Sequence, residues 1–274
     1  MTLLAVPNVS EGRERKAIDA IARAFDGRLL DVHSDVDHNR SVYTLAGEPG
    51  ALAQTILGGA REAIQRIDLR SHTGAHPRIG AVDVAPIVYL NEEDRGAACA
   101  EALVLAGALG AELDLPVYLY GALAGGRTRA ELRRGGPGAL AELPPDFGPD
   151  HMHPTAGATL VAARPPLVAF NLELAPPATQ VQAREIAARI REGGPEGLPG
   201  VRAIGLWLEE RGVAQVSTNV EDHRAVPLIH VVEAVSRQAA VSEAELVGLA
   251  PAAAFAGFPE EVVVRNKRTI EDAL

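Results

Sequence analysis

The stretch His72-Thr-Gly-Ala-His76-Pro-Arg78-Ile-Gly-Ala-Val-Asp83-Val84 joins a polar loop to the start of an apolar segment. It brings two imidazoles, a guanidinium and a carboxylate close together in the chain. Pro77 disfavours the helical region for His76, and Gly74 adds a second break, so the two histidines are predicted to lie in an extended loop. We interpret the stretch as an active-site loop that leads into a strand over residues 82–90.

Two histidines four residues apart are also typical of zinc-binding helices, in which a glutamate beside the first histidine acts as base. Here that glutamate is absent, and no third Cys, His or Asp follows at a metal-like spacing, so we expect no metal. A pair of surface or hydrogen-bonded structural histidines is the remaining alternative. The neighbouring Arg78 and Asp83 favour a functional loop.

The composition predicts a soluble protein of the cytoplasm. With 274 residues and 47% hydrophobic content, the chain can form one large or two modest cores. The single cysteine, Cys99, excludes internal disulfides. The N-terminus has no basic region or long apolar run, which predicts neither secretion nor a membrane span. A net charge of -10 argues against a generic nucleic-acid surface.

Recognition of anionic ligands is expected to rely on arginine. Only Lys16 and Lys267 are lysines among the 26 basic residues. Arg40 and Arg78 lie in polar segments beside histidines, where a guanidinium can bind a carboxylate through two hydrogen bonds. The general excess of arginine is equally well explained by genomic base composition.

The hydrophobic periodicity predicts two successive β-α-β-β-α-β units. In the first, strands are expected over 3–6, 28–32, 42–46 and 82–90, and helices over 14–25 and 49–67. An alanine-rich helix with Asn91 as its N-cap then runs to Leu113, followed by a strand over 116–120, a helix over 127–134 and an irregular segment to Pro154. In the second unit, strands are expected over 167–172, 201–208, 213–217 and 245–249, and helices over 179–191 and 227–238.

The expected fold class is therefore α/β, of the α+β type, with two domains over residues 1–165 and 166–274. Each would contain a mainly antiparallel sheet covered by helices on one face, with an active-site cleft between the two. Four polar clusters, at residues 7–13, 35–40, 72–83 and 147–157, fall at strand ends or in connections and could line one cleft.

These clusters also have structural interpretations. Ser10 could be a loose N-cap, and Asp35, Asp37 and Asn39 could be hairpin-turn residues. Asp83 could cap the strand that follows it. The segment from Gly148 to Gly157 could be a plain interdomain linker.

The motifs resemble, in order and over nearly the whole chain, the formiminotransferase domain of formiminotransferase-cyclodeaminase and its free-standing relatives. The matching motifs are Val6-Pro-Asn-Val-Ser-Glu-Gly12, Asn39-Arg-Ser-Val-Tyr-Thr44, His76-Pro-Arg-Ile-Gly-Ala-Val-Asp-Val84, Pro116-Val-Tyr-Leu-Tyr-Gly121, Phe147-Gly-Pro149, Ala169-Phe-Asn171, Ala214-Gln-Val-Ser-Thr-Asn219 and Glu245-Leu-Val-Gly-Leu249. The histidine loop is the most specific of them. A helical cyclodeaminase domain is not expected within 274 residues.

The resemblance implies transfer of a formimino group from N-formimino-L-glutamate to N5 of tetrahydrofolate, in histidine degradation and one-carbon metabolism, by a cytoplasmic homodimer. His76 matches the catalytic histidine. Residues assigned to substrate binding are Asp37, His38, Asn39, Arg40, Arg78 and Asp83, and those assigned to folate binding are Gly148, Pro149, Asp150, His151, Met152, His153, Pro154, Thr155, Ala156 and Gly157. Two positions depart from the family pattern: some members carry an aromatic residue at Ala156, and an acidic residue at His33, for which Asp35 or Asp37 could compensate.

The expected chemistry suits one imidazole, which can take a proton from the attacking amine and return it to the departing nitrogen. Asp83 could orient His76 or hydrogen-bond the pterin. Two alternatives remain: an ATP-using 5-formyltetrahydrofolate cyclo-ligase, although no phosphate-binding Gly-rich loop is visible, and a non-catalytic folate-binding protein. A bulky residue at Gly157 is expected to raise the folate KM and to leave thermal stability nearly unchanged.

Overall fold

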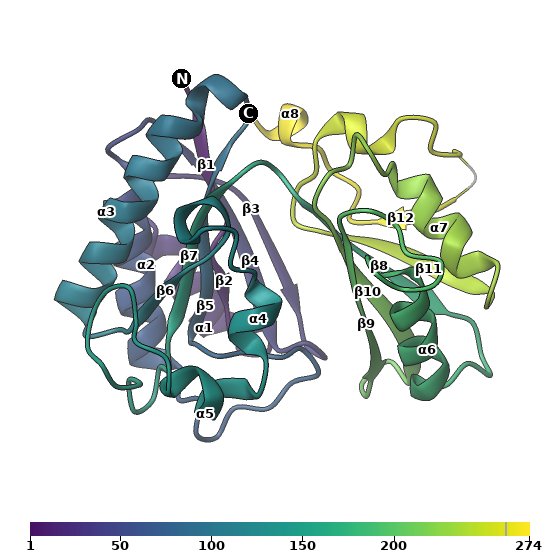
Figure 1. Ribbon diagram of the computed structural model, residues 1–274, viewed down its shortest axis with the longest axis horizontal. Coiled ribbons are helices and arrows are strands. Elements are labelled where there is room, and N and C mark those ends of the chain that lie inside the picture. Colours follow the sequence, from purple (N-terminus) through teal and green to yellow (C-terminus); the bar gives the residue numbers. More distant parts are fainter. Residues whose placement is uncertain (261) are drawn as a thin grey trace. The chain divides into compact units, whose positions relative to one another are not determined.

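The computed structural model describes residues 1–260 and 262–274 and divides into two compact units, Met1–Pro165 and Pro166–Leu274 (Figure 1). Unit 1 contains a seven-stranded sheet and unit 2 a five-stranded sheet, and each unit has its own apolar core. The mixed α/β class expected from the sequence is confirmed.

The sheet of unit 1 is mixed. Its strands are β1 (Leu3–Ala5), β2 (Asn8–Val9), β3 (Arg28–Asp35), β4 (Arg40–Gly47), β5 (Val82–Tyr89), β6 (Val117–Leu119) and β7 (Thr159–Arg164). β1 and β2 share one position between β4 and β5, because Pro7 lacks an N–H and interrupts the ladder between them. β3 pairs antiparallel with β4, and β1 and β2 pair antiparallel with both β4 and β5. β7 lies between β5 and β6 and is parallel to both. The sequence analysis did not predict β7.

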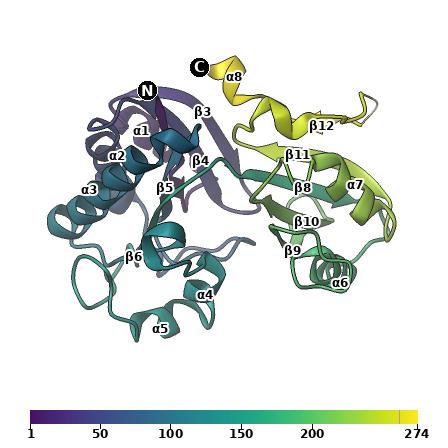
Figure 2. The ribbon, with the colours of Figure 1, turned by 45° about the horizontal axis from the view of Figure 1, so that its top comes forward.

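Helices cover both faces of this sheet, which corrects the expectation of a single covered face. On one face lie α1 (Arg15–Ala24), α2 (Leu52–Arg66) and α3 (Arg95–Leu113), which enclose the main core with strand residues such as Ile87. On the other face, α4 (Arg129–Arg133) and α5 (Gly136–Ala141) bury Leu132 and Leu140 against Tyr118. Short 3-10 turns at Glu92–Asp94 and Gly121–Ala124 precede α3 and follow β6. Figure 2 shows α4 and α5 away from α2 and α3.

Helix α3 is held against α2 and the sheet. Its Glu101 carboxylate accepts hydrogen bonds from the amides of Gly50 (2.5 Å) and Ala53 (2.7 Å), and so satisfies the N-terminus of α2. Asn91 does not cap the helix with its side chain, because a 3-10 turn intervenes; this expectation was wrong.

Among the described residues, one helical stretch, Glu92–Leu113, is long and apolar enough to cross a membrane by length and composition alone. A core helix passes the same test. Here the buried residues of α3 lie in the main core of unit 1, where the helix packs on β5 and β7.

Unit 2 follows the predicted order of elements. Its strands are β8 (Val168–Leu174), β9 (Val201–Leu208), β10 (Val213–Val220), β11 (Val241–Val247) and β12 (Val264–Arg265), and its helices are α6 (Gln180–Ile190), α7 (Leu228–Ser236) and α8 (Ile270–Ala273), with a 3-10 turn at Ala252–Phe255. The sheet order is β12-β11-β8-β10-β9, and only β11 and β12 are parallel. Alternate residues of β8, such as Phe170 and Leu172, are fully buried with residues of α6 and α7.

The largest difference from the expected elements lies in the hairpin of β3 and β4. Residues 33–40 were interpreted as a polar loop, yet β3 continues to Asp35 and β4 begins at Arg40. His33 and Asp35 occupy inward positions of the strand and are buried. Polar residues at buried strand positions break the alternation of apolar and polar side chains, so the pattern indicated a loop.

Candidate active site around His76

The loop that carries His76 is held together by Arg78. The Nη2 of Arg78 donates to the carbonyl oxygens of Gly74 (2.7 Å) and His76 (3.1 Å), and its Nη1 donates to that of His72 (3.3 Å). Both terminal nitrogens thus bind the backbone of the loop. In this structure Arg78 shapes the loop, and its assignment to substrate binding stays a prediction.

Asn39 ties this loop to two others in unit 1. It has a left-handed backbone (φ 47°) at the end of the turn between β3 and β4. Its Oδ1 accepts from the amide of Gly12 (2.9 Å), and its Nδ2 donates to the carbonyl of Thr73 (2.8 Å). The amide of Ala75 also donates to the carbonyl of Asp37 (2.9 Å). The first three polar clusters therefore contact one another, with Asn39 as a link between them. The single cleft expected from the sequence stays a prediction.

Asp83 lies at a β-bulge. β2 pairs Asn8 with Val84 and Val9 with Val82, which leaves Asp83 as an extra residue of β5. The bulge explains why Val82 faces the main core while Val84 faces the opposite cluster. It turns the Asp83 carboxylate into the protein, where the side chain is fully buried.

The Asp83 carboxylate is paired with two arginines. Its Oδ2 accepts from Nη1 of Arg40 (2.7 Å) and from Nη2 of Arg133, and its Oδ1 accepts from the amide of Ile79 (2.8 Å). Burial by itself would raise the pKa of Asp83, but the charges of Arg133 and Arg40 and the Ile79 hydrogen bond bring that pKa below its ordinary value. Asp83 is therefore ionised over the whole physiological range.

His76 is placed to act as a base. Its Nδ1 lies 2.7 Å from the carbonyl oxygen of Pro77. A carbonyl can only accept, so in the neutral ring we assign the proton to Nδ1, which leaves the lone pair of Nε2 available. Burial, followed by the charges of Arg40, Arg133 and His38, lowers the pKa of His76 well below its ordinary value. The half-buried imidazole is thus neutral at physiological pH.

The other predicted substrate-binding residues surround this histidine or support it. The ring of His38 lies 5.9 Å from that of His76, centroid to centroid, at an interplanar angle of 44°. Asp35 Oδ1 accepts from the His38 amide at 2.7 Å. Asp37 is buried in the same turn, with 4% of its surface exposed. Arg40 forms an ion pair with Asp83, and its Nε donates a hydrogen bond to Oδ1 of Asn8 at 3.0 Å.

The segment from Gly148 to Gly157 lies against the far end of the histidine loop. Gly157 forms isolated antiparallel β-bridges with Gly80 and with His153. The carbonyl of Ala156 accepts a hydrogen bond from the amide of Ala81 (2.8 Å). Asp150 and His151 are exposed, whereas Pro149 and Met152 are half-buried. The exposed residues Gly148 and Pro154 and the half-buried Thr155 complete the segment.

Ala156 and Gly157 have structural roles that the sequence analysis did not foresee. Ala156 is 1% exposed and packs in the main core of unit 1, so its side chain offers no surface to a ligand. Gly157 has φ 69°, and a Cβ there would overlap the carbonyl oxygen of Ile79. The expectation that a bulky residue at Gly157 leaves stability unchanged is therefore wrong, because L residues are strained in this conformation.

Sequence reasoning missed Arg133, and it named Asn8 only as a member of the first polar cluster. Arg133 lies 50 positions from Asp83 in the sequence, at the end of a short helix. The available signal was Asp83 itself, since a carboxylate inside an apolar strand requires a partner of opposite charge. Nothing in the local sequence says which of many arginines supplies it.

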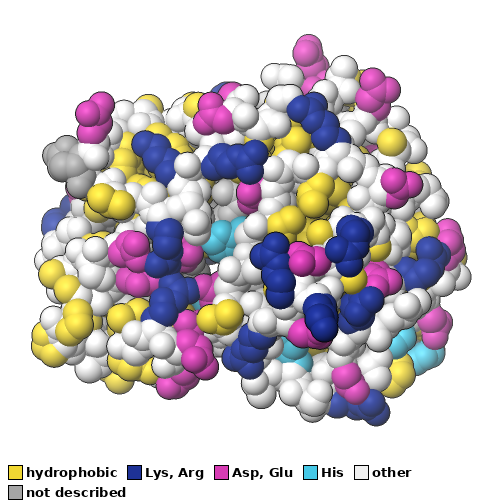
Figure 3. Space-filling view, turned by 180° about the vertical axis from the view of Figure 1, so that it is seen from behind, with side chains coloured by type: hydrophobic (Ala, Val, Ile, Leu, Met, Phe, Trp, Pro, Cys, Tyr) yellow, Lys and Arg dark blue, Asp and Glu magenta, His cyan; other side chains and the backbone are white. Residues whose placement is uncertain are grey.

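No metal centre accompanies this site in the part of the chain that the structure describes: no group of three or more His, Cys, Asp or Glu side chains there could hold an ion. On the face shown in Figure 3, basic side chains are interspersed with acidic ones. No continuous basic patch is seen on that face.

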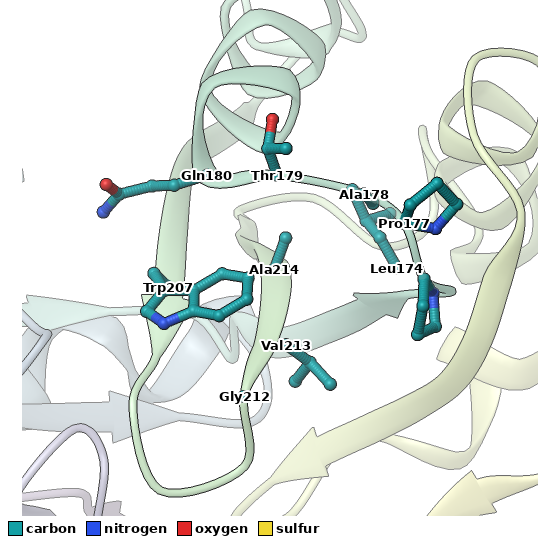
Figure 4. A pocket seen from close by; sticks show the side chains of 10 residues that line it. Leu174, Pro177, Ala178, Thr179, Gln180, Trp207, Gly212, Val213 and Ala214 are labelled. Atoms are coloured by element: carbon teal, nitrogen blue, oxygen red, sulfur yellow. The ribbon is translucent and has the colours of Figure 1, made fainter.

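Unit 2 contains a separate hollow of about 510 Å³ (Figure 4). Its lining residues are Leu174, Pro176, Pro177, Ala178, Thr179, Gln180, Trp207, Gly212, Val213 and Ala214. Trp207 on β9 lies below the turn that leads into α6. None of the predicted site residues lines this hollow.

The fold and site define a class: a protein of two α/β units with a neutral histidine, held in a loop beside a two-arginine carboxylate cluster in the first unit. Two family models match the chain. The N-terminal subdomain of the formiminotransferase domain matches residues 2–164, and the formiminotransferase domain model matches residues 169–272. The chain belongs to the formiminotransferase domain family, as its sequence motifs indicated.

Curated relatives agree with this membership. The chain is 36% identical to glutamate formimidoyltransferase of Streptococcus pyogenes serotype M1, over 93% of this chain and 91% of that protein. It is 34% identical to the protein of the same name from Thermoplasma acidophilum, over 90% of this chain and 87% of that protein. It is 41% identical to formimidoyltransferase-cyclodeaminase of Rattus norvegicus over 90% of this chain, but spans only 49% of that relative's length.

Proposed function

We propose that this protein transfers a formimino group from N-formimino-L-glutamate to N5 of tetrahydrofolate. The observation that carries the proposal is the state of His76: Nδ1 is bound to the Pro77 carbonyl, and Nε2 is left as a base. Family membership and the names of the full-length bacterial and archaeal relatives support this reaction. Tetrahydrofolate would be a co-substrate, and the reaction would need no metal.

In the proposed reaction the N5 amine attacks the formimino carbon, and a C–N bond forms. Nε2 of His76 accepts the proton that N5 loses. The same imidazole then donates this proton to the glutamate nitrogen as the original C–N bond breaks, so that glutamate leaves as an amine. A pKa below the ordinary histidine value favours the first step, because the ring must begin neutral.

Binding of the two anionic substrates is assigned to the residues around His76. Arg40 and Arg133 carry two positive charges and share one carboxylate, so one positive charge remains to attract a substrate carboxylate. Asp37 and His38 are proposed to contact substrate from the turn between β3 and β4. The segment of residues 148–157 is proposed to contact folate through its exposed part, Asp150 and His151.

The test is a transferase assay on the purified chain with formiminoglutamate and tetrahydrofolate. We expect 5-formiminotetrahydrofolate as product, and a loss of kcat of about 10² to 10⁴ fold in His76→Gln. His230→Gln, at an exposed position of α7, is the matched control and should keep full activity. Unchanged turnover in His76→Gln would remove this histidine from the mechanism. Tight folate binding without product from any donor would instead indicate a binding protein.

The same proposal includes a homodimer, a cytoplasmic location and a place in histidine degradation. These follow from the resemblance to the family. Light scattering of the purified chain would test the dimer, and fractionation of the source cells would test the location. Growth of a deletion strain on histidine would test the pathway.

A further inference from the structure

The short helix α4 carries Arg133 to the site from the second face of the unit 1 sheet. Thr128 begins the helix with a capping box, in which its side chain and that of Glu131 each bond the other's backbone amide. Leu132 is 2% exposed and packs in the same cluster as Tyr118, whose hydroxyl donates to the carbonyl of Leu140 (3.0 Å). The helix is thus anchored to the sheet, and Arg133 is its last residue.

Arg133 makes one ion pair and leaves one donor unused. Its Nη2 binds the Asp83 carboxylate, and its side chain is 19% exposed. Its Nε is buried and has no hydrogen-bond partner among the described residues. A buried unsatisfied donor costs free energy, so an arginine that served packing alone would be a poor choice at this position.

Asp83 connects Arg133 to the catalytic loop. One carboxylate oxygen binds the two arginines, and the other accepts from the amide of Ile79, three residues after His76. Loss of Arg133 would leave Asp83 with Arg40 as its charged partner. The carboxylate could then rotate, and the Ile79 hydrogen bond that fixes the end of the loop would weaken.

We propose that Arg133 is a positioning residue for the reaction: with Arg40 it fixes Asp83, and through the Ile79 amide it holds the loop so that His76 presents Nε2 to the substrates. The inference rests on the proposed function of this site. Arg133 touches neither His76 nor a reacting atom in this role. It acts on the orientation and the charge of the imidazole.

Four groups from neighbouring elements set the charge around His76. Arg40 from β4, Arg133 from α4 and His38 from the turn after β3 lower the pKa of the imidazole, after burial, and Asp83 from β5 raises it. Removing Arg133 removes one cation, so the pKa of His76 rises toward its ordinary value. The base is then protonated at a higher pH, and the acidic limb of the kcat/KM profile moves to higher pH.

The experiment compares Arg133→Met, Arg133→Lys and the control Arg134→Met in the full chain. Arg134 is the next residue and is exposed. We measure the pKa of His76 by NMR titration of its ring proton, assigned with His76→Gln, and kcat and KM against pH. In Arg133→Met we expect a pKa increase of about one unit and a fall in kcat of about tenfold or more. KM should also rise, because the cluster loses the positive charge proposed to attract a substrate carboxylate.

Lysine keeps the charge but not the planar fork, so Arg133→Lys should keep the wild-type pKa of His76 and still lose kcat about threefold to tenfold. Arg134→Met should match wild type in both readouts. An unchanged pKa and kcat in folded Arg133→Met would overturn the inference. If that variant does not fold, a wild-type kcat in Arg133→Lys would overturn it.

The NMR readout separates this inference from the proposed reaction. If wild-type protein shows no formimino transfer but the pKa of His76 still rises in Arg133→Met, the reaction is wrong and the influence of Arg133 on the histidine stands. If wild-type protein transfers the formimino group and Arg133→Met changes neither the pKa of His76 nor kcat, the reaction is supported and the proposed role of Arg133 is wrong.

Discussion

At the scale of single residues, Asp83 has the widest consequences in unit 1. Its charge is fully buried in a strand that is otherwise apolar, and it is stabilised only because two arginines and one amide converge on it. The sequence showed the carboxylate and Arg40. It did not show that they pair, because the contact joins β4 to β5 across 43 positions of the chain.

We predict that Asp83→Asn lowers the free energy of unfolding by about 3–5 kcal/mol, since two largely buried guanidinium groups, 10% and 19% exposed, lose their counter-charge. Chemical denaturation measures this change. Asp19→Asn is the control: Asp19 pairs with Arg15 at 2.9 Å on the exposed face of α1, and its loss should cost no more than about 1 kcal/mol. Equal effects of the two substitutions would show that the buried cluster adds no stability.

At the scale of elements, the longer helices and the strands β8 to β11 of unit 2 were predicted. Strand β7 of the unit 1 sheet was not, nor were the short elements β2, α5, β12 and α8. The apolar periodicity of α1 and α2 follows from one buried face, which a sequence displays directly. By contrast, β7 belongs to the sheet because it pairs with β5 on one side and with β6 on the other. Its partners are distant in the chain, so no local pattern distinguished it from the irregular segment before it.

The turn before β7 gives a prediction at this scale. Gly157→Ala should lower the free energy of unfolding by about 1–3 kcal/mol because alanine is strained at a φ of 69°. The overlap of the new Cβ with the Ile79 carbonyl adds to this loss. Thermal melting measures the loss. Gly96→Ala is the control: it lies in the first turn of α3 with no atom near its Cβ position, and should stabilise by up to about 1 kcal/mol. A Gly157→Ala variant as stable as wild type would contradict the structure of this turn.

At the scale of the whole molecule, the chain builds two cores that share no residues. Unit 2 spans Pro166–Leu274 and contains its own five-stranded sheet with α6 and α7 on one face (Figure 1). A unit of this size with a complete core meets the usual conditions for independent folding. His76, Asp83 and the two arginines that pair with Asp83 all belong to unit 1.

We predict that residues 166–274 fold when expressed alone, with a cooperative thermal transition in circular dichroism. Leu172→Ala, in the centre of β8 and fully buried, should lower the free energy of unfolding of this fragment by about 2–5 kcal/mol. The same substitution in the full chain should have a similar effect. A fragment that shows no cooperative transition would mean that the core of unit 2 depends on unit 1.

The α/β class, the order of the main helices and strands in unit 2, and the loop on which the proposed function rests could all be predicted from the amino-acid sequence. These properties depend on short-range patterns: apolar periodicity, the break at Pro77, and the motif around His76. Three other features became known only from the three-dimensional packing: Arg133 pairs with Asp83, polar residues continue β3 to Asp35, and Gly157 packs against the Ile79 carbonyl. Those outcomes depend on burial and charge pairing between distant segments, and a residue's local sequence carries no record of which distant group will desolvate or neutralise it.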